Sequence, residues 1–270
     1  VRHGVTGGGK RLRPILCVSA WRAATVRGVP GGSERATPDA VYDLSASLEM
    51  IHAYSLMHDD LPCMDDAELR RGRPTTHRVH GEAVTMRAGA VLIPAAALQA
   101  LAACRALGCA EADGRAAARA LLEGSGAGGM VGGQWLDLRG EGRALGPDDL
   151  DDLHRRKTGA LLTASLVVGA VAAGATDRVR DGLTAYGRAI GLAFQIADDI
   201  LDATASAEAL GKNPSDAELD KSTYVSLHGL ADAAARARAE VDGARGALAR
   251  AGIASPPLEA LARYVVERDR

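Results

Sequence analysis

Two clusters of aspartates, each placed where an apolar helical run ends, constrain the fold of this chain more than any other feature. The first cluster lies between His58 and Asp66, and the second lies between Gln195 and Asp202. Neighbouring carboxylates repel one another and raise one another's pKa unless a multivalent cation lies between them. We therefore expect the ends of these two helices to face each other across one shared metal site.

The chemistry of the donors identifies the expected metal. Neither cluster carries an accompanying set of His or Cys ligands. Hard oxygen ligands favour Mg²⁺, which keeps several waters and completes its octahedron with substrate phosphates. We therefore predict a Mg²⁺ site and a substrate that carries a phosphate or diphosphate. The candidate ligands are Asp59, Asp60, Asp65, Asp198, Asp199 and Asp202.

The spacing of the carboxylates differs between the two clusters. Asp198 and Asp202 are four residues apart and project from one helix face. Asp59 and Asp65 are six residues apart, or about 240° around an ideal helix, and Pro62 removes a backbone donor between them. The first helix should bulge or end near Pro62, so that its carboxylates converge. The alternative is a solvated helix cap, and finding two such clusters, each after an apolar helix, disfavours it.

Basic residues accompany the acidic clusters and predict contacts to a second anion. The chain opens with a glycine-rich basic segment, Gly7 to Pro14, in which glycines let the backbone approach an anion while basic side chains supply charge. This segment is not the phosphate loop of nucleotide hydrolases, whose Lys is followed by Ser or Thr. We expect one diphosphate to bind through Mg²⁺ and another to bind cations directly. The candidate cations are Lys10, Arg13, Arg70, Arg71, Lys157, Lys212 and Lys221.

Taken in order along the chain, these motifs resemble those of the trans-type isoprenyl diphosphate synthases, the polyprenyl synthetase family. Within that family the similarity is greatest to the bacterial farnesyl diphosphate synthases. One departure is the stretch Arg87 to Val91, where the family pattern has Gly-Asp before the next helix. The matching segments are Gly8 to Pro14, Ile51 to His77, Gly132 to Leu138, His154 to Leu162, Gly191 to Asp202, Leu210 to Lys212 and Asp220 to Tyr224.

The resemblance implies an all-α, single-domain helical bundle of the isoprenoid synthase type with a central active-site cavity. Residues 1–270 would form that domain and would lack an N-terminal helix, since the chain starts at Val1. The family is dimeric as a rule, so a homodimer is expected. The patterning agrees with a helical bundle, because Pro38 and Pro147 are predicted to begin helices and strand signals are nearly absent. Loops are predicted over residues 27–37, 107–114, 139–146, 203–223 and 252–256.

The resemblance also implies a reaction. Isopentenyl diphosphate would be condensed head-to-tail with C5 and C10 allylic diphosphates, through Mg²⁺-assisted ionisation to an allylic carbocation, to give farnesyl diphosphate. Thr158 and Gln195 would aim oxygen dipoles at the cation, and the departing diphosphate would take the final proton. Isopentenyl diphosphate is expected at Lys10, Arg13, His52 and Arg71, and the allylic diphosphate at Arg70, Lys157, Lys212 and Lys221.

The length of the product is predicted from the helix that precedes the first cluster. Tyr54 lies five residues before Asp59, about 7.5 Å back along a helix, where its ring would form a floor beneath a growing prenyl tail. Ser55 is small and leaves room beside that ring, and Pro62-Cys63 is expected, by resemblance, to narrow the same tunnel. A C15 product is therefore favoured over C20, the geranylgeranyl alternative.

Composition limits the alternatives. The chain has one Phe, two Trp and five Tyr, whereas terpene cyclases use aromatic walls to steer cations. A non-catalytic partner subunit would be expected to lose motif residues. A di-iron bundle would need a Glu-x-x-His motif from each of two helices, whereas the sequence holds one such motif, Glu49 to His52. The net charge of −2 gives no support to nucleic-acid binding.

The subcellular location of the protein is predicted from its cysteines and from the hydropathy of its helices. Four cysteines without metal-type spacing are typical of reduced thiols in a cytoplasmic protein. Two charge-free stretches, residues 88–104 and 158–176, approach the roughly 20 residues that span a bilayer. Their polar and small residues favour buried core helices instead, so no stable membrane insertion is expected.

Overall fold

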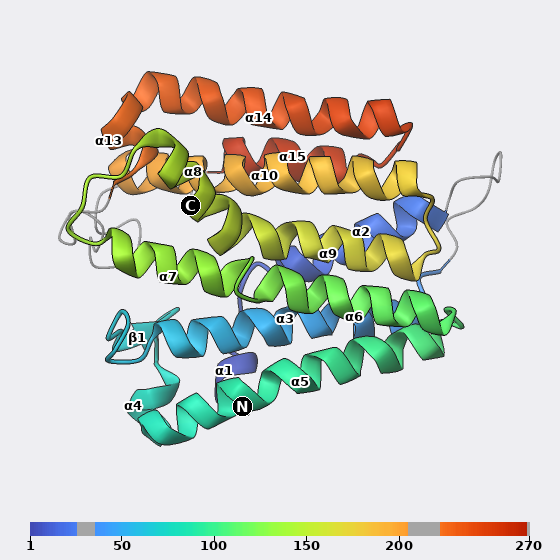
Figure 1. Cartoon of the computed structure of the whole chain (residues 1–270), viewed down its shortest axis with the longest axis horizontal. Helices are drawn as coiled ribbons and strands as arrows, with labels where there is room; N and C mark the ends of the chain where they lie inside the picture. The colour runs from blue at the N-terminus through green and yellow to red at the C-terminus, as the bar shows by residue number, and fades with distance from the viewer. Residues whose placement is uncertain (26–35, 205–221, 269–270) are drawn as a thin grey trace.

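The computed structural model describes residues 1–25, 36–204 and 222–268. Within these ranges the regular structure is helical apart from one antiparallel hairpin, and the long helices run with their axes roughly aligned (Figure 1). This arrangement confirms the predicted all-α bundle. The elements are α1 (Arg2–Val5), α2 (Leu12–Thr25), α3 (Asp39–Asp59), β1 (Leu69–Arg70), β2 (Arg73–Pro74), α4 (Thr76–His80), α5 (Glu82–Ala106), α6 (Glu111–Ser125), α7 (Met130–Gly140), α8 (Pro147–His154), the π-helix η1 (Arg155–Gly159), α9 (Ala160–Ala172), α10 (Asp177–Thr204), α13 (Tyr224–His228), α14 (Leu230–Ala251) and α15 (Pro256–Glu267).

Several element boundaries follow from the local sequence. Pro38 precedes α3, and Pro147 is the first residue of α8, where its missing N–H has no intrahelical partner to lose. α6 begins at Glu111, inside the loop predicted over residues 107–114. That prediction was wrong at its C-terminal side, because acidic residues in the first turn stabilise a helix N-terminus. The departure at residues 87–91 lies within the continuous helix α5.

Helix α9 is the centre of the hydrophobic core. Leu162 and Leu166 pack into one cluster with α2, α10, α14 and α15, while Leu161 and Val168 pack into a second cluster with α3, α5 and α6. A helix that is apolar around its whole circumference is buried in this way. The two halves of the bundle are thus joined through α9, and α3 and α10 lie on opposite sides of it (Figure 1).

Helix α5 differs from the prediction that residues 88–104 form a buried core helix. One face of α5 packs on α3 and α6, but Val91 is 60% exposed and Leu98 is 66% exposed. α5 is also long and apolar enough to cross a membrane, although this criterion is met by core helices of soluble proteins as well. The apolar sequence did not reveal which face of α5 lacks a partner within the chain.

The π-helix η1 lies between α7 and α10, and a glycine sets its distance from α7. A Cβ atom added at Gly133 of α7 would lie 2.1 Å from the backbone nitrogen of Lys157. The close approach therefore requires glycine at this position. π-Helical turns inside α-helices are frequent at functional sites, and this one carries Lys157 and Thr158.

Candidate active site

The first aspartate cluster converges because the chain reverses direction after α3. α3 ends at Asp59, and the N–H of Asp65 then donates a hydrogen bond to the carbonyl of Asp59 at 2.9 Å. The predicted end of the helix near Pro62 is confirmed. Burial raises the pKa of Asp59, Lys157 opposes the shift and the carboxylate of Asp65 adds to it, which together leave the pKa at about 6.

The second cluster reaches the same region through η1. Lys157 interacts electrostatically with Asp59 on α3, and the adjacent hydroxyl of Thr158 donates to Oε1 of Gln195 on α10 at 3.1 Å. η1 therefore contacts Gln195 of α10 through Thr158 and interacts with Asp59 of α3 through Lys157, and the shared metal site stays a prediction. Within the described ranges no three His, Cys, Asp or Glu side chains are close enough to enclose a metal ion by themselves. The donors that the two clusters offer are carboxylate oxygens, which Mg²⁺ binds together with water and phosphate.

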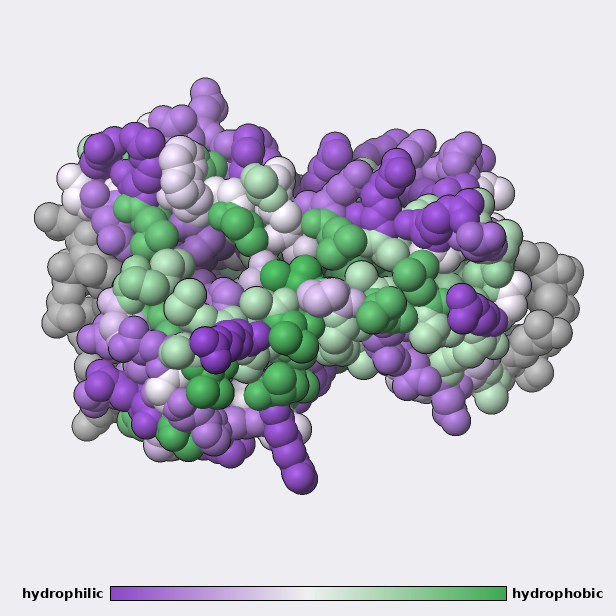
Figure 2. All heavy atoms as spheres, turned by 60° about the horizontal axis from the view of Figure 1, so that its bottom comes forward, coloured by the Kyte–Doolittle hydropathy of each residue, from purple (hydrophilic) through white to green (hydrophobic). Residues whose placement is uncertain are grey.

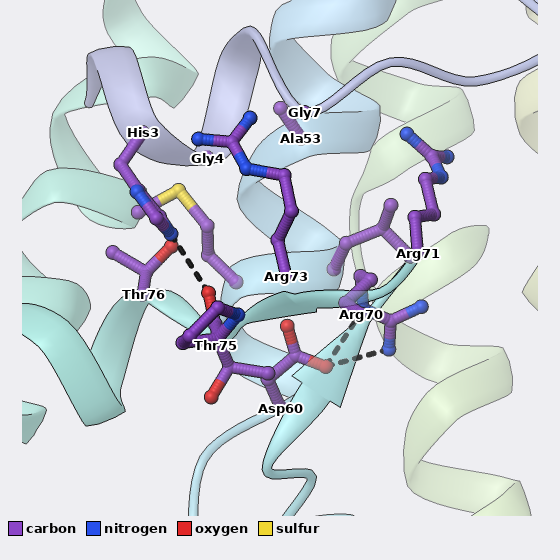
Figure 3. Close-up of a pocket in the computed structure, with 13 residues that line it drawn as sticks. His3, Gly4, Gly7, Ala53, Asp60, Arg70, Arg71, Arg73, Thr75 and Thr76 are labelled. Atoms are coloured by element: carbon purple, nitrogen blue, oxygen red, sulfur yellow. Dashed lines mark hydrogen bonds and ion pairs between the residues drawn. The ribbon is translucent and has the colours of Figure 1, made fainter.

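The middle aspartate of each cluster contacts protein donors. Asp60 is 4% exposed and accepts hydrogen bonds from Arg70 at 2.7 Å (Figure 3). Asp199 is 6% exposed and accepts from Nε2 of Gln195 at 3.3 Å and from the backbone N–H of Tyr224 at 2.8 Å. Asp60 can therefore orient Arg70, and Asp199 can orient Gln195. Asp65 and Asp202 are solvent-exposed.

The hairpin after the first cluster presents two arginines in different directions. β1 and β2 are joined through Arg71 and Gly72, both with positive φ, the conformation that a two-residue hairpin turn requires. A non-glycine residue in this conformation costs energy and marks functional sites. Arg70 turns toward Asp60, whereas Arg71 and Arg73 extend away from that carboxylate (Figure 3). No pattern in the sequence predicted this hairpin.

Arg71 is held against the glycine-rich segment at the start of the chain. Its guanidinium donates to the carbonyl of Gly8, and a Cβ atom added at Gly9 would lie 2.7 Å from that guanidinium. The glycines thus let the backbone approach a protein cation, where the sequence predicted approach to an anion. Arg11, also with positive φ, pairs with Glu49 at 2.5 Å.

The predicted site for isopentenyl diphosphate forms a basic cluster around α3. Burial lowers the pKa of Arg13 to about 10, so its guanidinium stays charged at neutral pH. Burial and then the charge of Arg13 lower the pKa of His52 to about 2, so its imidazole is neutral. Within the described chain, Nε of Arg13 and Nδ1 of His52 are buried without a hydrogen-bond partner. Lys10 is exposed.

A cleft of about 570 Å³, open to solvent, lies between α7, α8, η1 and α10. Lys157, Gln195 and Asp199 line it together with Asp137, whose carboxylate accepts from Nζ of Lys157 at 2.5 Å. A second cleft of about 410 Å³ lies beside the hairpin, lined by Arg70 and Arg71 among others (Figure 3). Six predicted site residues line one or the other of the two clefts: Asp60, Arg70, Arg71, Lys157, Gln195 and Asp199.

Not every predicted residue is placed by the structure. Lys212 and Lys221 lie outside the described residues. Tyr54 is 5% exposed, contacts His58 edge to face at 5.5 Å between ring centroids, and lines neither cleft. Ser55 is half-buried, and its hydroxyl donates to the carbonyl of His52 at 2.9 Å. The chain-length role of Tyr54 and Ser55 stays a prediction.

Three acidic residues of the site were not singled out from the sequence. Glu49 is 9% exposed and pairs with Arg11, Asp137 pairs with Lys157, and Asp151 is 6% exposed and pairs with Arg236 at 2.5 Å. The signal for Glu49 was a carboxylate within an apolar helical run, one turn before His52. Asp137 lay inside a quoted matching segment, but no feature of the sequence linked it to Lys157.

A model of the Polyprenyl synthetase family matches residues 1–247 of the chain. The chain belongs to the polyprenyl synthetase family. This confirms the resemblance inferred from the motifs, and it accounts for the helical bundle that brings them together.

Individual relatives cover most or all of the chain. The chain is 42% identical to farnesyl diphosphate synthase from Escherichia coli (strain K12), covering 100% of this chain and 88% of the relative. It is 41% identical to chloroplastic geranylgeranyl pyrophosphate synthase from Catharanthus roseus, covering 100% of this chain and 73% of the relative. Among solved structures, the Helicobacter pylori geranyltransferase complexed with magnesium and isoprenyl diphosphate is similar, with a TM-score of 0.81, 32% identity and coverage of 98% of this chain and 84% of that one.

Proposed function

We propose that the protein is a short-chain prenyltransferase that condenses isopentenyl diphosphate head-to-tail with C5 and C10 allylic diphosphates to give farnesyl diphosphate. The observation that carries the proposal is the juxtaposition of two kinds of anion site. Lys157 interacts with Asp59 of the first aspartate cluster, the adjacent Thr158 donates to Gln195 at the start of the second, and Arg13 interacts with His52 of α3. A reaction that joins two diphosphates requires both kinds of site.

The acidic side of the site would bind the allylic diphosphate. Asp59, Asp65 and Asp198 would hold Mg²⁺, which stabilises negative charge on the leaving diphosphate. A bound magnesium in the structure of the Helicobacter pylori relative supports this assignment. Arg70, oriented by Asp60, and Lys157, oriented by Asp137, would neutralise the same leaving group with fixed positive charge.

The carbocation left by ionisation lies next to fixed dipoles. The hydrogen bond between Thr158 and Gln195 orients both side chains, so their oxygen atoms can face the positive charge without reorganising during the reaction. The departing diphosphate, held at Arg70 and Lys157, would accept the proton lost from the coupled product. Asp199 fixes Gln195 from the other side.

The basic side would bind isopentenyl diphosphate. Lys10, Arg13 and Arg71 supply charge, and the neutral imidazole of His52 can donate one hydrogen bond without adding to their mutual repulsion. Glu49 lowers that repulsion by pairing with Arg11. The buried, unpartnered nitrogens of Arg13 and His52 are donors that an oxyanion would satisfy.

We also propose a homodimer in the cytoplasm. Hydrophobic side chains form a band across the face to which α5 contributes (Figure 2). A second copy of the chain packed on this face would shield the band from water, so that no membrane is needed to cover it. All four cysteines are free thiols, in keeping with a reducing compartment. The exposed hydrophobic residues of α5, α6 and α7 are Val84, Met86, Val91, Leu98, Leu122, Val131 and Trp135.

The reaction is tested by incubating the protein with Mg²⁺, isopentenyl diphosphate and the C10 allylic diphosphate. Chromatography of the dephosphorylated products should give a C15 alcohol as the main species. A C20 main product would favour the geranylgeranyl alternative, which similarity to the Catharanthus roseus relative keeps open. A hydrocarbon product would indicate a cyclase, and recovery of unchanged substrates would contradict the proposal.

Product length is tested at Tyr54. Tyr54→Ala should shift the products to C20 or longer, because removing a buried ring would deepen the space beneath the tail. It should also cost a few kcal/mol of folding free energy through the cavity. Tyr42→Ala on the same helix is the matched control, since Tyr42 is 48% exposed. An unchanged product spectrum from a folded, active Tyr54→Ala enzyme would reject Tyr54 as the floor.

A further inference from the structure

Arg268 places a charged side chain in the interior at the end of α15. The helix ends at Glu267, the backbone N–H of Arg268 donates to the carbonyl of Tyr264 at 3.1 Å, and the side chain of Arg268 is only 2% exposed. A guanidinium cannot lose its charge in a protein, and burying one is costly unless it is paired. Its partners therefore indicate what this arginine does.

Those partners are two residues one turn apart on α10. One terminal nitrogen donates to the carbonyl of Phe194 at 2.9 Å and to Oδ1 of Asp198 at 2.7 Å. The guanidinium carbon lies 3.9 Å from the centre of the Phe194 ring. The stacked and hydrogen-bonded geometry holds the charge of Arg268 directly against a carboxylate of the second acidic cluster.

Asp198 is also reachable from solvent. Its side chain is 38% exposed, so the carboxylate can be approached from solvent while Arg268 holds it from the interior. The positive charge of Arg268 makes this carboxylate a poorer ligand for a cation, because it occupies one oxygen and offsets the negative charge.

We propose that Arg268 is a positioning residue that holds the Asp198 carboxylate until a divalent cation displaces it, so that the end of α15 sets the metal affinity of the second acidic cluster. This inference rests on the proposed role of Asp198 as a metal ligand. It adds a competing protein cation to that role, contributed from the far end of the chain.

The test is Mn²⁺ binding to the protein without substrate, measured by electron paramagnetic resonance of free Mn²⁺. Arg268→Gln keeps an apolar stem and a donor for the Phe194 carbonyl but removes the charge, so it should bind Mn²⁺ roughly tenfold more tightly, the effect of one charge-assisted contact. Arg268→Lys should restore affinity close to that of the wild type. Arg263→Gln on the same helix is the control, because Arg263 is exposed and the change in net charge is equal.

Two further variants make the outcome decisive. If circular dichroism shows that Arg268→Gln does not fold, Phe194→Leu takes its place, since loss of the ring loosens the guanidinium and should also tighten Mn²⁺ binding. Asp198→Asn should weaken Mn²⁺ binding. If Asp198→Asn weakens it but the folded Arg268 or Phe194 variant does not tighten it, or if Arg263→Gln tightens it equally, the Arg268 proposal is overturned alone. If Asp198→Asn has no effect, the metal assignment fails and this proposal fails with it.

Discussion

Charged residues at this site are held by other charged residues. Glu49 holds Arg11, Asp60 holds Arg70, and Asp137 holds Lys157. Each pair fixes a long, flexible side chain before substrate arrives, which lowers the conformational entropy lost on binding. At the scale of the residue, Asp60 and Asp137 would therefore contribute to the proposed diphosphate binding by fixing Arg70 and Lys157.

Arg13 tests the basic subsite. Arg13→Ala should raise the KM for isopentenyl diphosphate, because loss of one charge-assisted contact costs about 1.5 to 3 kcal/mol, whereas the KM for the allylic substrate should change little. Steady-state kinetics with each substrate varied in turn measures both values. Arg78→Ala is the control, since Arg78 is exposed, pairs with Asp66 and Glu68 and lines neither cleft. A selective defect for the allylic substrate would mean that the two subsites are exchanged.

At the scale of the element, η1 carries the groups that connect the two acidic clusters. The position of η1 depends on Gly133 of α7, because the missing side chain lets the backbones of α7 and η1 approach each other. A helix segment packed this closely cannot adjust to added volume without moving. The placement of Lys157 and Thr158 is therefore coupled to a residue that has no functional group.

Gly133→Ala should displace η1. The added methyl group would overlap the backbone of Lys157, so we expect a loss of about 1 to 3 kcal/mol in folding free energy and a lower kcat. Gly243→Ala in α14 is the matched control, because a Cβ at Gly243 meets no atom within 4 Å, and it should be neutral or stabilising by up to about 1 kcal/mol. Thermal unfolding and turnover of both variants, compared with the wild type, measure these effects. A Gly133→Ala enzyme with unchanged Tm and kcat would show that close packing does not position η1.

The sequence predicted the elements better than their contacts. Pro62 predicted the end of α3, and the spacing of Asp198 and Asp202 predicted a helical second cluster, because backbone geometry and side-chain periodicity are local properties. The hairpin after the first cluster was missed, since its turn uses a positive φ at Arg71, a residue type that rarely adopts it. The pairing of Arg268 with Asp198 joins residues 70 positions apart, and no local pattern encodes such a contact.

At the scale of the whole molecule, the exposed apolar face of α5 is the largest difference between the predicted and the observed core. The hydropathy of a helix predicts that it is buried. It does not distinguish a helix buried within one chain from a helix buried between two chains. The proposed homodimer reconciles the two, because α5 would become a core helix of the assembly.

Leu98 tests that assembly. Leu98→Glu should convert a dimer to a monomer in light scattering after size exclusion, because the substitution would bury an unpaired charge in the interface. Leu230→Glu is the control, since Leu230 is 45% exposed at the start of α14, a helix outside the proposed interface. If the wild-type protein is monomeric at micromolar concentration, or if both variants dissociate equally, the α5 interface is wrong.

The central claim is that aspartates from two distant helices act on one diphosphate, and turnover of single variants tests it most directly. Asp59→Asn and Asp198→Asn should each lower turnover by about three orders of magnitude or more, which corresponds to roughly 4 kcal/mol of transition-state stabilisation, with the helical circular dichroism unchanged. Asp66→Asn is the control, because Asp66 is the last aspartate of the first cluster, is not a candidate ligand, is exposed and pairs with Arg78. It should keep near-normal turnover. Near-normal turnover of a folded Asp59→Asn or Asp198→Asn enzyme would contradict a shared site.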